Sequence, residues 1–169
     1  MVPPMARVIP VLRGLNQLAT GELFKLGTQC DVMMGRSRSC GISYQRFRRW
    51  LALSENERHI RDHFNSAVSR KHLHLTTQGS LLTLENFSGT GTKVNAETLI
   101  TKQTYDLARM SVTLQLGSAE ELFRIELMDE GQADAYLATL PPIADPTRLP
   151  GVPDPVEEAT PKQNRVLPP

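Results

Sequence analysis

Residues 72–85 read HLHLTTQGSLLTLE, in which apolar and polar residues alternate on both sides of a short turn. An alternation with period two places the apolar side chains on one face of a β-strand. Two such runs joined by a turn are typical of neighbouring antiparallel strands. We therefore expect strands at 72–76 and 81–85.

Similar short runs, bounded by glycine or polar turns, recur on both sides of this pair. They occupy residues 7–12, 22–26, 31–34, 92–95, 97–100, 104–107, 111–116 and 122–127. Closely spaced strands with turn signals between them favour an antiparallel β-sandwich or barrel. Strands and helices do not alternate along the sequence, so a parallel α/β sheet is not expected. The predicted fold class is all-β.

Residues 44–64, YQRFRRWLALSENERHIRDHF, depart from the strand pattern. Ser54 and Glu57 have the spacing of a capping box, which predicts a helix that continues through Ile60 and Phe64. The segment is expected to form a short helical insertion between two strands.

This insertion combines arginines with aromatic residues and has three possible interpretations. The favoured one is a helix that packs its apolar side chains on the sandwich while its arginines face water; the apolar set is Phe47, Trp50, Leu51, Ile60 and Phe64. The alternatives are a positive face that extends a ligand site towards acidic residues, and nucleic-acid binding, which is the less favoured. His59 and His63 have the i, i+4 spacing of zinc ligands but no apparent third ligand, so no metal or other cofactor is expected.

The length of 169 residues suits one ordinary domain, which we place at residues 5–130. Residues 131–169 are expected to be a Pro-rich disordered tail or linker, because nine of the twelve prolines lie between Pro141 and Pro169. Thr147 and Thr160 in this tail raise the possibility of self-association.

The formal net charge is +1, so the overall charge favours neither nucleic acid nor membranes as partners. The sequence contains neither an apolar run long enough to span a membrane nor the layout of a secretory signal. Cys30 and Cys40 are too few for a disulfide framework, so we expect reduced thiols in a cytoplasmic protein.

Three clusters of polar residues lie at turns just outside the expected strands. They are Gly35-Arg36-Ser37, Ser69-Arg70-Lys71-His72 and Ser88-Gly89-Thr90-Gly91-Thr92. An arginine fork can hold a phosphate with two hydrogen bonds, serine offers a hydroxyl donor, and a Gly-rich turn offers backbone N–H groups to an anion. Together the clusters predict a shallow pocket for a dianionic group.

The same residues, in this order, resemble the signature of the forkhead-associated (FHA) domain family. The resemblance covers roughly residues 7–128 and implies an eleven-stranded β-sandwich whose loops bind a phosphothreonine peptide. It implies that Arg36 and Ser69 contact the phosphate and that Arg70 adds a contact beside them. It further implies that His72, Gly35 and Gly91 support the site, which contains no catalytic residue.

The sequence departs from the family pattern at two turns. Thr90 stands where the family usually has an asparagine that holds the peptide main chain, and a threonine is shorter and offers a single hydroxyl. We still expect Thr90 to contact the peptide. Asn95-Ala96 replaces an Asn-Gly turn and loses the residue that best tolerates a positive φ angle.

The sequence therefore predicts a module, not an enzyme, that binds threonine-phosphorylated partner proteins in signalling. The alternative is a scaffold for phosphate-independent protein–protein interaction or oligomerisation, and a further alternative is the regulatory front end of a larger protein.

Overall fold

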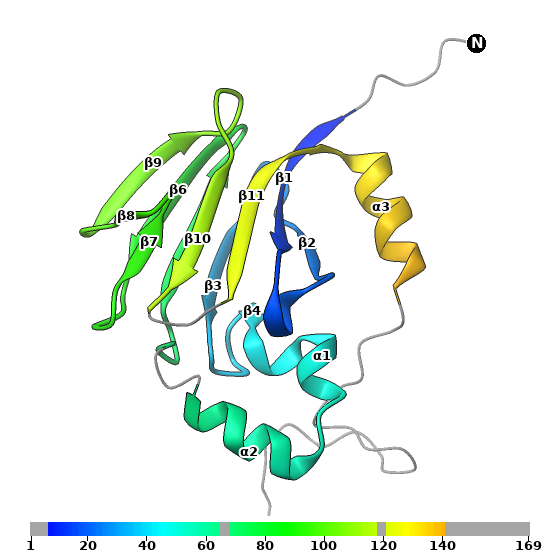
Figure 1. Ribbon diagram of the computed structural model, residues 1–169. Coiled ribbons are helices and arrows are strands. Elements are labelled where there is room, and N and C mark those ends of the chain that lie inside the picture. The colour runs from blue at the N-terminus through cyan, green and yellow to red at the C-terminus, as the bar shows by residue number, and fades with distance from the viewer. Residues whose placement is uncertain (1–6, 65–67, 118–120, 141–169) are drawn as a thin grey trace, which may run out of the picture.

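A computed structural model describes residues 7–64, 68–117 and 121–140. In these residues eleven strands form two sheets that pack face to face, with short helices at one end and on one side (Figure 1). The predicted all-β sandwich with a helical insertion is confirmed. Thr147, Thr160 and the rest of 141–169 lie outside the described residues.

One sheet has six strands in the order β2-β1-β11-β10-β7-β8. Their bounds are β1 Val8–Gly14, β2 Leu23–Lys25, β7 Thr92–Val94, β8 Glu97–Thr98, β10 Val112–Leu116 and β11 Leu122–Asp129. All neighbours in this sheet are antiparallel, and β1 pairs with β11 along its whole length. The sheet therefore joins the two ends of the domain sequence.

The other sheet has five strands in the order β4-β3-β5-β6-β9. Their bounds are β3 Asp31–Gly35, β4 Ile42–Ser43, β5 Leu73–Gln78, β6 Leu81–Asn86 and β9 Lys102–Asp106. The predicted pair at 72–85 forms β5 and β6, in antiparallel register from Leu73↔Asn86 to Gln78↔Leu81. Only β3 and β4 run parallel among the described strands.

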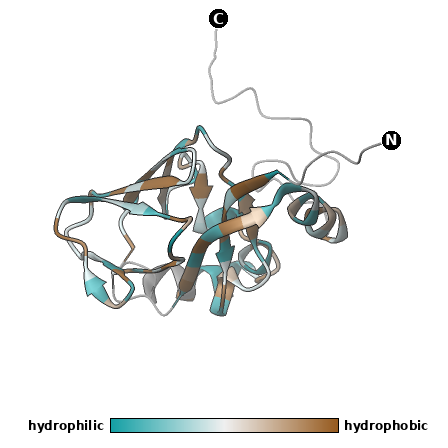
Figure 2. Ribbon diagram, turned by 90° about the horizontal axis from the view of Figure 1, so that it is seen from above, coloured by the Kyte–Doolittle hydropathy of each residue, from teal (hydrophilic) through white to brown (hydrophobic). Residues whose placement is uncertain are grey.

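The hydrophobic core fills the space between the two sheets. Leu73 and Leu75 of β5, Leu82 and Leu84 of β6, and Leu114 of β10 are completely buried. They alternate with more exposed polar residues, which Figure 2 shows as changes between brown and teal along the strands. Burial of each such leucine stabilises the fold by roughly 1.5–3 kcal/mol, so the alternation that predicts the strands also fixes which face packs inwards.

The helical insertion contains η2 Tyr44–Arg46, α1 Arg48–Leu51 and α2 Glu55–Phe64. The predicted capping box is present at the start of α2: Glu57 N–H donates to Ser54 Oγ at 3.1 Å, and Ser54 N–H donates to Glu57 Oε1 at 3.0 Å. These two hydrogen bonds lower the pKa of Glu57.

Two side chains anchor the insertion in the core. Phe47 is fully buried, with its ring centroid 5.1 Å from that of Tyr44 and 6.0 Å from that of Phe123. Trp50 is 7% exposed. Ile60, in contrast, is 50% exposed, so its predicted packing on the sandwich is wrong. The side chains of residues 61–64, including His63 and Phe64, are outside the described set.

The arginines of the insertion do not all face water, which corrects the favoured interpretation. Arg48 donates from its backbone N–H and its Nη1 to the carboxylate of Glu22, each at 2.7 Å. Glu22 is only 3% exposed. Arg58 donates from Nε to the carbonyl of Trp50 at 3.2 Å and from Nη2 to that of Leu51 at 2.6 Å.

A third helix, α3 Glu130–Thr139, follows β11 and packs beside β1 and β2 (Figure 1). Ala133 is fully buried in a small cluster with Ile9, Val11 and Leu23. The helix continues past residue 130, where the sequence predicts the end of the domain, so residues 131–139 are not a tail. Leu137 of the same helix is partly buried against this cluster, and the Tyr136 hydroxyl donates to the carbonyl of Gly21 at 2.8 Å.

Within the described residues, the helices are too short and too polar to span a membrane. Both cysteines are free thiols, with Cys40 buried and Cys30 partly buried.

Candidate functional site

Three loops meet at the end of the sandwich where the helical insertion lies (Figure 1). They connect β3 to β4, the insertion to β5, and β6 to β7. Arg36 N–H donates to the carbonyl of Ser69 at 3.1 Å, and Ser37 N–H donates to that of Arg70 at 3.1 Å. The structure thus brings together the first two of the three predicted clusters through their backbones.

Gly35 allows this close approach. A Cβ atom at this position would lie 2.2 Å from the carbonyl oxygen of Arg70 and 3.0 Å from the backbone nitrogen of His72. Both neighbours are backbone atoms, so they cannot turn aside as a flexible side chain could. A glycine is therefore required here, because two chain segments approach each other too closely for a side chain.

Arg36 is partly buried, and its Nε donates to the carbonyl of Val68 at 3.0 Å. This hydrogen bond and the backbone contact to Ser69 tie both ends of the arginine to residues 68–69. An arginine held through Nε keeps its guanidinium in a fixed direction, which reduces the entropy lost when the group binds an anion.

A row of three hydroxyl groups connects the loop before β5 to the β6–β7 loop. Ser69 Oγ lies 2.8 Å from Ser88 Oγ, which lies 2.7 Å from Thr90 Oγ1. Ser88 Oγ also accepts the N–H of Thr90 at 3.0 Å. Ser88 itself is only 8% exposed, whereas Ser69 is partly exposed and Thr90 is exposed. The two outer hydroxyls are therefore the ones that a ligand can reach.

Ser88 is held in turn by Asn86, a residue that sequence reasoning missed. Asn86 Oδ1 accepts the N–H of Ser88 at 3.2 Å and the hydroxyl of Thr92 at 2.9 Å, while its Nδ2 donates to the carbonyl of Ser88 at 3.0 Å. Asparagine commonly bonds the backbone two residues ahead. An Asn two positions before the Ser-Gly-Thr-Gly turn was the available signal.

His72 lies fully buried beneath these loops and connects two of them. Its Nδ1 accepts the N–H of Ser69 at 3.0 Å, so the proton is on Nε2, which donates to the carbonyl of Gly91 at 2.7 Å. The ring is therefore neutral in one tautomer. Burial lowers the pKa of His72, and the hydrogen bond to Gly91 opposes this change to a smaller extent.

Gly91 has φ +88°, a conformation that glycine adopts without steric cost, and its carbonyl also accepts the N–H of Gly117 at 2.8 Å. Arg70 and Lys71 are exposed. The backbone carbonyl of Arg70 accepts the N–H of Ser37, so this residue positions the β3–β4 loop as well as offering a charge.

The Asn95-Ala96 turn between β7 and β8 keeps the positive φ angles that an Asn-Gly turn would have, +52° and +70°. Ala96 thus occupies a left-handed conformation that costs a residue with a Cβ roughly 1–2 kcal/mol. Asn95 Oδ1 accepts the N–H of Thr113 at 2.8 Å, which holds the turn against β10.

Comparison with known proteins gives a match in structure alone. No protein-family model and no curated protein sequence matches the chain. The FHA domain of the CT664 protein from Chlamydia trachomatis matches with a TM-score of 0.50 and 17% identity, over 70% of this chain and 96% of that one. The FHA domain of an Arabidopsis thaliana protein matches with a TM-score of 0.50 and 14% identity, over 76% and 93%. The match to the Schizosaccharomyces pombe Nbs1–Ctp1 complex has a TM-score of 0.50 and 13% identity, over 70% and 36%.

Proposed function

This chain has the fold of forkhead-associated (FHA) domains, and we propose that it binds segments of partner proteins that carry a phosphothreonine. The proposal includes a role in signalling as a docking module, without catalysis by the chain itself. The site lies on the three loops around Arg36, Ser69 and Thr90.

The observation that carries this proposal is the fixed position of Arg36 beside Ser69. Arg36 Nε is held by Val68, and its backbone N–H by the carbonyl of Ser69. A phosphate carries about −1.5 to −2 charges and three acceptor oxygens near neutral pH. A directed guanidinium next to an accessible hydroxyl offers such a group a charge and several donors. An unmodified threonine has no negative charge to pair with the guanidinium and only one oxygen to accept hydrogen bonds.

The other predicted site residues take supporting or flanking roles in this proposal. Thr90 is at the other end of the row of hydroxyls from Ser69, with Ser88 between them, and contacts the peptide beside the phosphate. Arg70 is exposed next to Ser69 and adds a positive charge. The hydrogen bond between His72 and Gly91 joins the loop before β5 to the β6–β7 loop.

The test is titration of the chain with a degenerate phosphothreonine peptide library and its unphosphorylated counterpart. We expect only the phosphorylated peptides to bind and Arg36→Ala to weaken binding at least about tenfold, because hydrogen bonds to charged groups contribute roughly 1.5–3 kcal/mol each. Arg109→Ala is the matched control: Arg109 is exposed in the β9–β10 turn at the opposite end of the sandwich. This control should bind like the unaltered chain.

One observation favours a second function, a phosphate-independent scaffold. The hydroxyls of Ser69 and Thr90 already have a hydrogen-bond partner inside the protein, because both lie within hydrogen-bond distance of Ser88 Oγ. In addition, Thr90 replaces the asparagine expected to hold a peptide. If partner binding is unchanged by phosphatase treatment and by Arg36→Ala in a folded protein, the scaffold replaces the phosphothreonine reader.

A further inference from the structure

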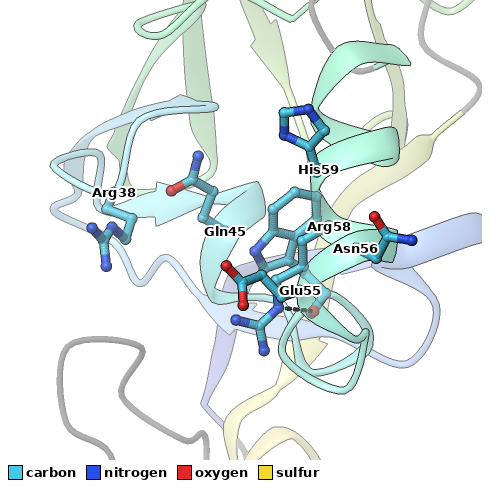
Figure 3. A pocket seen from close by; sticks show the side chains of 7 residues that line it. Arg38, Gln45, Glu55, Asn56, Arg58 and His59 are labelled. Carbon is cyan, nitrogen blue, oxygen red and sulfur yellow. Dashed lines mark hydrogen bonds between the residues drawn. The ribbon is translucent and has the colours of Figure 1, made fainter.

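The helical insertion and the β3–β4 loop enclose an open hollow of about 680 Å³ next to the phosphate-binding loops. It is lined by Arg38, Gln45, Trp50, Glu55, Asn56, Arg58 and His59. Figure 3 shows Arg38 and Gln45 on one side of the hollow and Glu55 and His59 of α2 on the other, while the side chain of Asn56 points away from Arg38 and Gln45. The inserted helices create one wall of this hollow, so it is a feature that the insertion adds to the sandwich.

The lining offers hydrogen-bond donors and positive charge. Arg38 is exposed, and its side chain contacts no partner in the described part of the chain. Arg58 uses Nε and Nη2 for carbonyls within the insertion, which fixes its guanidinium in the wall. Gln45 adds an amide donor. Glu55 is the one carboxylate in the lining.

The surroundings are also basic. Residues 36–71 contain nine Lys or Arg, of which Arg48 is paired with Glu22, and three Asp or Glu, although the whole chain is balanced at 19 against 18. This concentration of positive charge lies at the end of the sandwich that carries the insertion and the site loops (Figure 1). A surface of one sign attracts ligand segments of the opposite sign.

The hollow is close enough to Arg36 for one peptide to occupy both places. Arg38 is two residues after Arg36 in the same loop, and two residues of extended chain span at most about 7 Å. The backbone of the loop is closed on itself here, since Cys40 N–H donates to the carbonyl of Ser37 at 3.0 Å. A side chain a few positions from the phosphothreonine can therefore reach the hollow.

We propose that this hollow binds an acidic residue that flanks the phosphothreonine, so that the chain selects phosphothreonine segments rich in aspartate, glutamate or a second phosphate. The inference rests on the proposed function and specifies its ligand class. Arg38 and Arg58 supply the positive charge, and Gln45 donates a hydrogen bond to the carboxylate. Glu55 opposes the same ligand, because it brings a like charge to the wall.

The experiment compares two phosphothreonine peptides that differ only in acidic or neutral flanking residues. We expect the acidic peptide to bind roughly threefold to tenfold more tightly at low salt, with the difference decreasing as salt is added. Arg38→Gln should bring the affinity of the acidic peptide down to that of the neutral one. Glu55→Gln should increase the preference, and the remote Arg109→Gln should leave it unchanged.

The outcomes separate this inference from the proposed function. Equal affinity for the two peptides, or a preference that persists in Arg38→Gln, overturns the inference while phosphothreonine binding stands. If the unaltered chain binds neither phosphothreonine peptide, both this inference and the proposed function are overturned. Tight binding of a single-stranded oligonucleotide that Arg38→Gln abolishes, with no preference between the peptides, assigns the hollow to nucleic acid instead. Urea unfolding of each variant checks that it is folded. Because Arg38 and Glu55 are exposed, we expect the midpoints to equal that of the unaltered chain.

Discussion

His72 couples the loops of the site to pH. It is buried as a neutral ring that accepts the N–H of Ser69 and donates to the carbonyl of Gly91. A proton on Nδ1 would remove the acceptor and leave the N–H of Ser69 without its partner. Because burial lowers the pKa of His72 in the folded state, the unfolded chain binds more protons once the pH falls below about 6.5.

We therefore expect His72 to reduce the free energy of unfolding as the pH falls through 6.5, by at most about 1.4 kcal/mol per pH unit, until the folded-state pKa is reached. The measurement is the urea midpoint at pH 7.5 and at pH 5.0 for the unaltered chain and for His72→Gln. The variant should be less stable at pH 7.5 and lose less on acidification. The exposed His59→Gln serves as control. Equal losses in His72→Gln and the unaltered chain would contradict the assignment.

The ion pair of Glu22 and Arg48 adds a polar contact to the attachment of the helical insertion, which Phe47 and Trp50 anchor in the core. The carboxylate accepts both the first backbone N–H of α1 and the Nη1 of Arg48. With Glu22 at 3% exposure, removal of its partner would leave a buried charge uncompensated, which typically costs about 3–5 kcal/mol.

We expect Arg48→Ala to lower the free energy of unfolding by about 3 kcal/mol, because Arg48 is itself 22% exposed and water can replace part of its contact. Arg49→Ala is the neighbouring control; it removes an exposed arginine and should change stability by less than about 0.5 kcal/mol. The free energies come from urea unfolding. A double variant with Glu22→Gln should lose less than the two single variants together. Additive losses would show that the pair does not act as a unit.

At the scale of the whole molecule, the sequence predicts what periodicity and short-range chemistry determine. The alternation at 72–85 predicts β5 and β6, and the Ser54–Glu57 spacing predicts the start of α2. The two-residue strand β4 is too short to show any period. The contact of Glu22 with Arg48 joins residues 26 positions apart, and nothing in the local pattern of either residue indicates it.

The candidate site, too, can be predicted from the sequence only in part. The three loop clusters are visible in the sequence because glycine, arginine and hydroxyl residues gather at turns. Their mutual arrangement is not, since it depends on Asn86, Ser88 and the close approach at Gly35. These contacts form only when the two sheets bring the loops to one end of the sandwich.

Helix α3 contributes to the stability of the domain at its C-terminal boundary. The buried face of α3 packs Ala133 against Ile9, Val11 and Leu23. On its exposed side, Lys25 of β2 forms hydrogen bonds with Asp134 and Glu130, which raise the pKa of Lys25. Burial of apolar area contributes more than exposed ion pairs, which are screened by water and salt. Truncation of the chain after Asp129 should therefore lower the free energy of unfolding by about 2–4 kcal/mol, whereas truncation after Leu140 should leave it unchanged.

Lys25→Ala separates the two contributions, because it removes the ion pairs and keeps the helix. We expect its urea midpoint to differ little from that of the unaltered chain, which would assign the stabilisation by α3 to apolar burial. The chain that ends at Asp129 should bind phosphopeptides normally at temperatures where it is folded, since α3 lies beside β1 and β2 while the site loops lie at the end of the sandwich (Figure 1). Equal stability of the two truncated chains would place the end of the domain at residue 130, with α3 only resting against a sandwich that is complete without it.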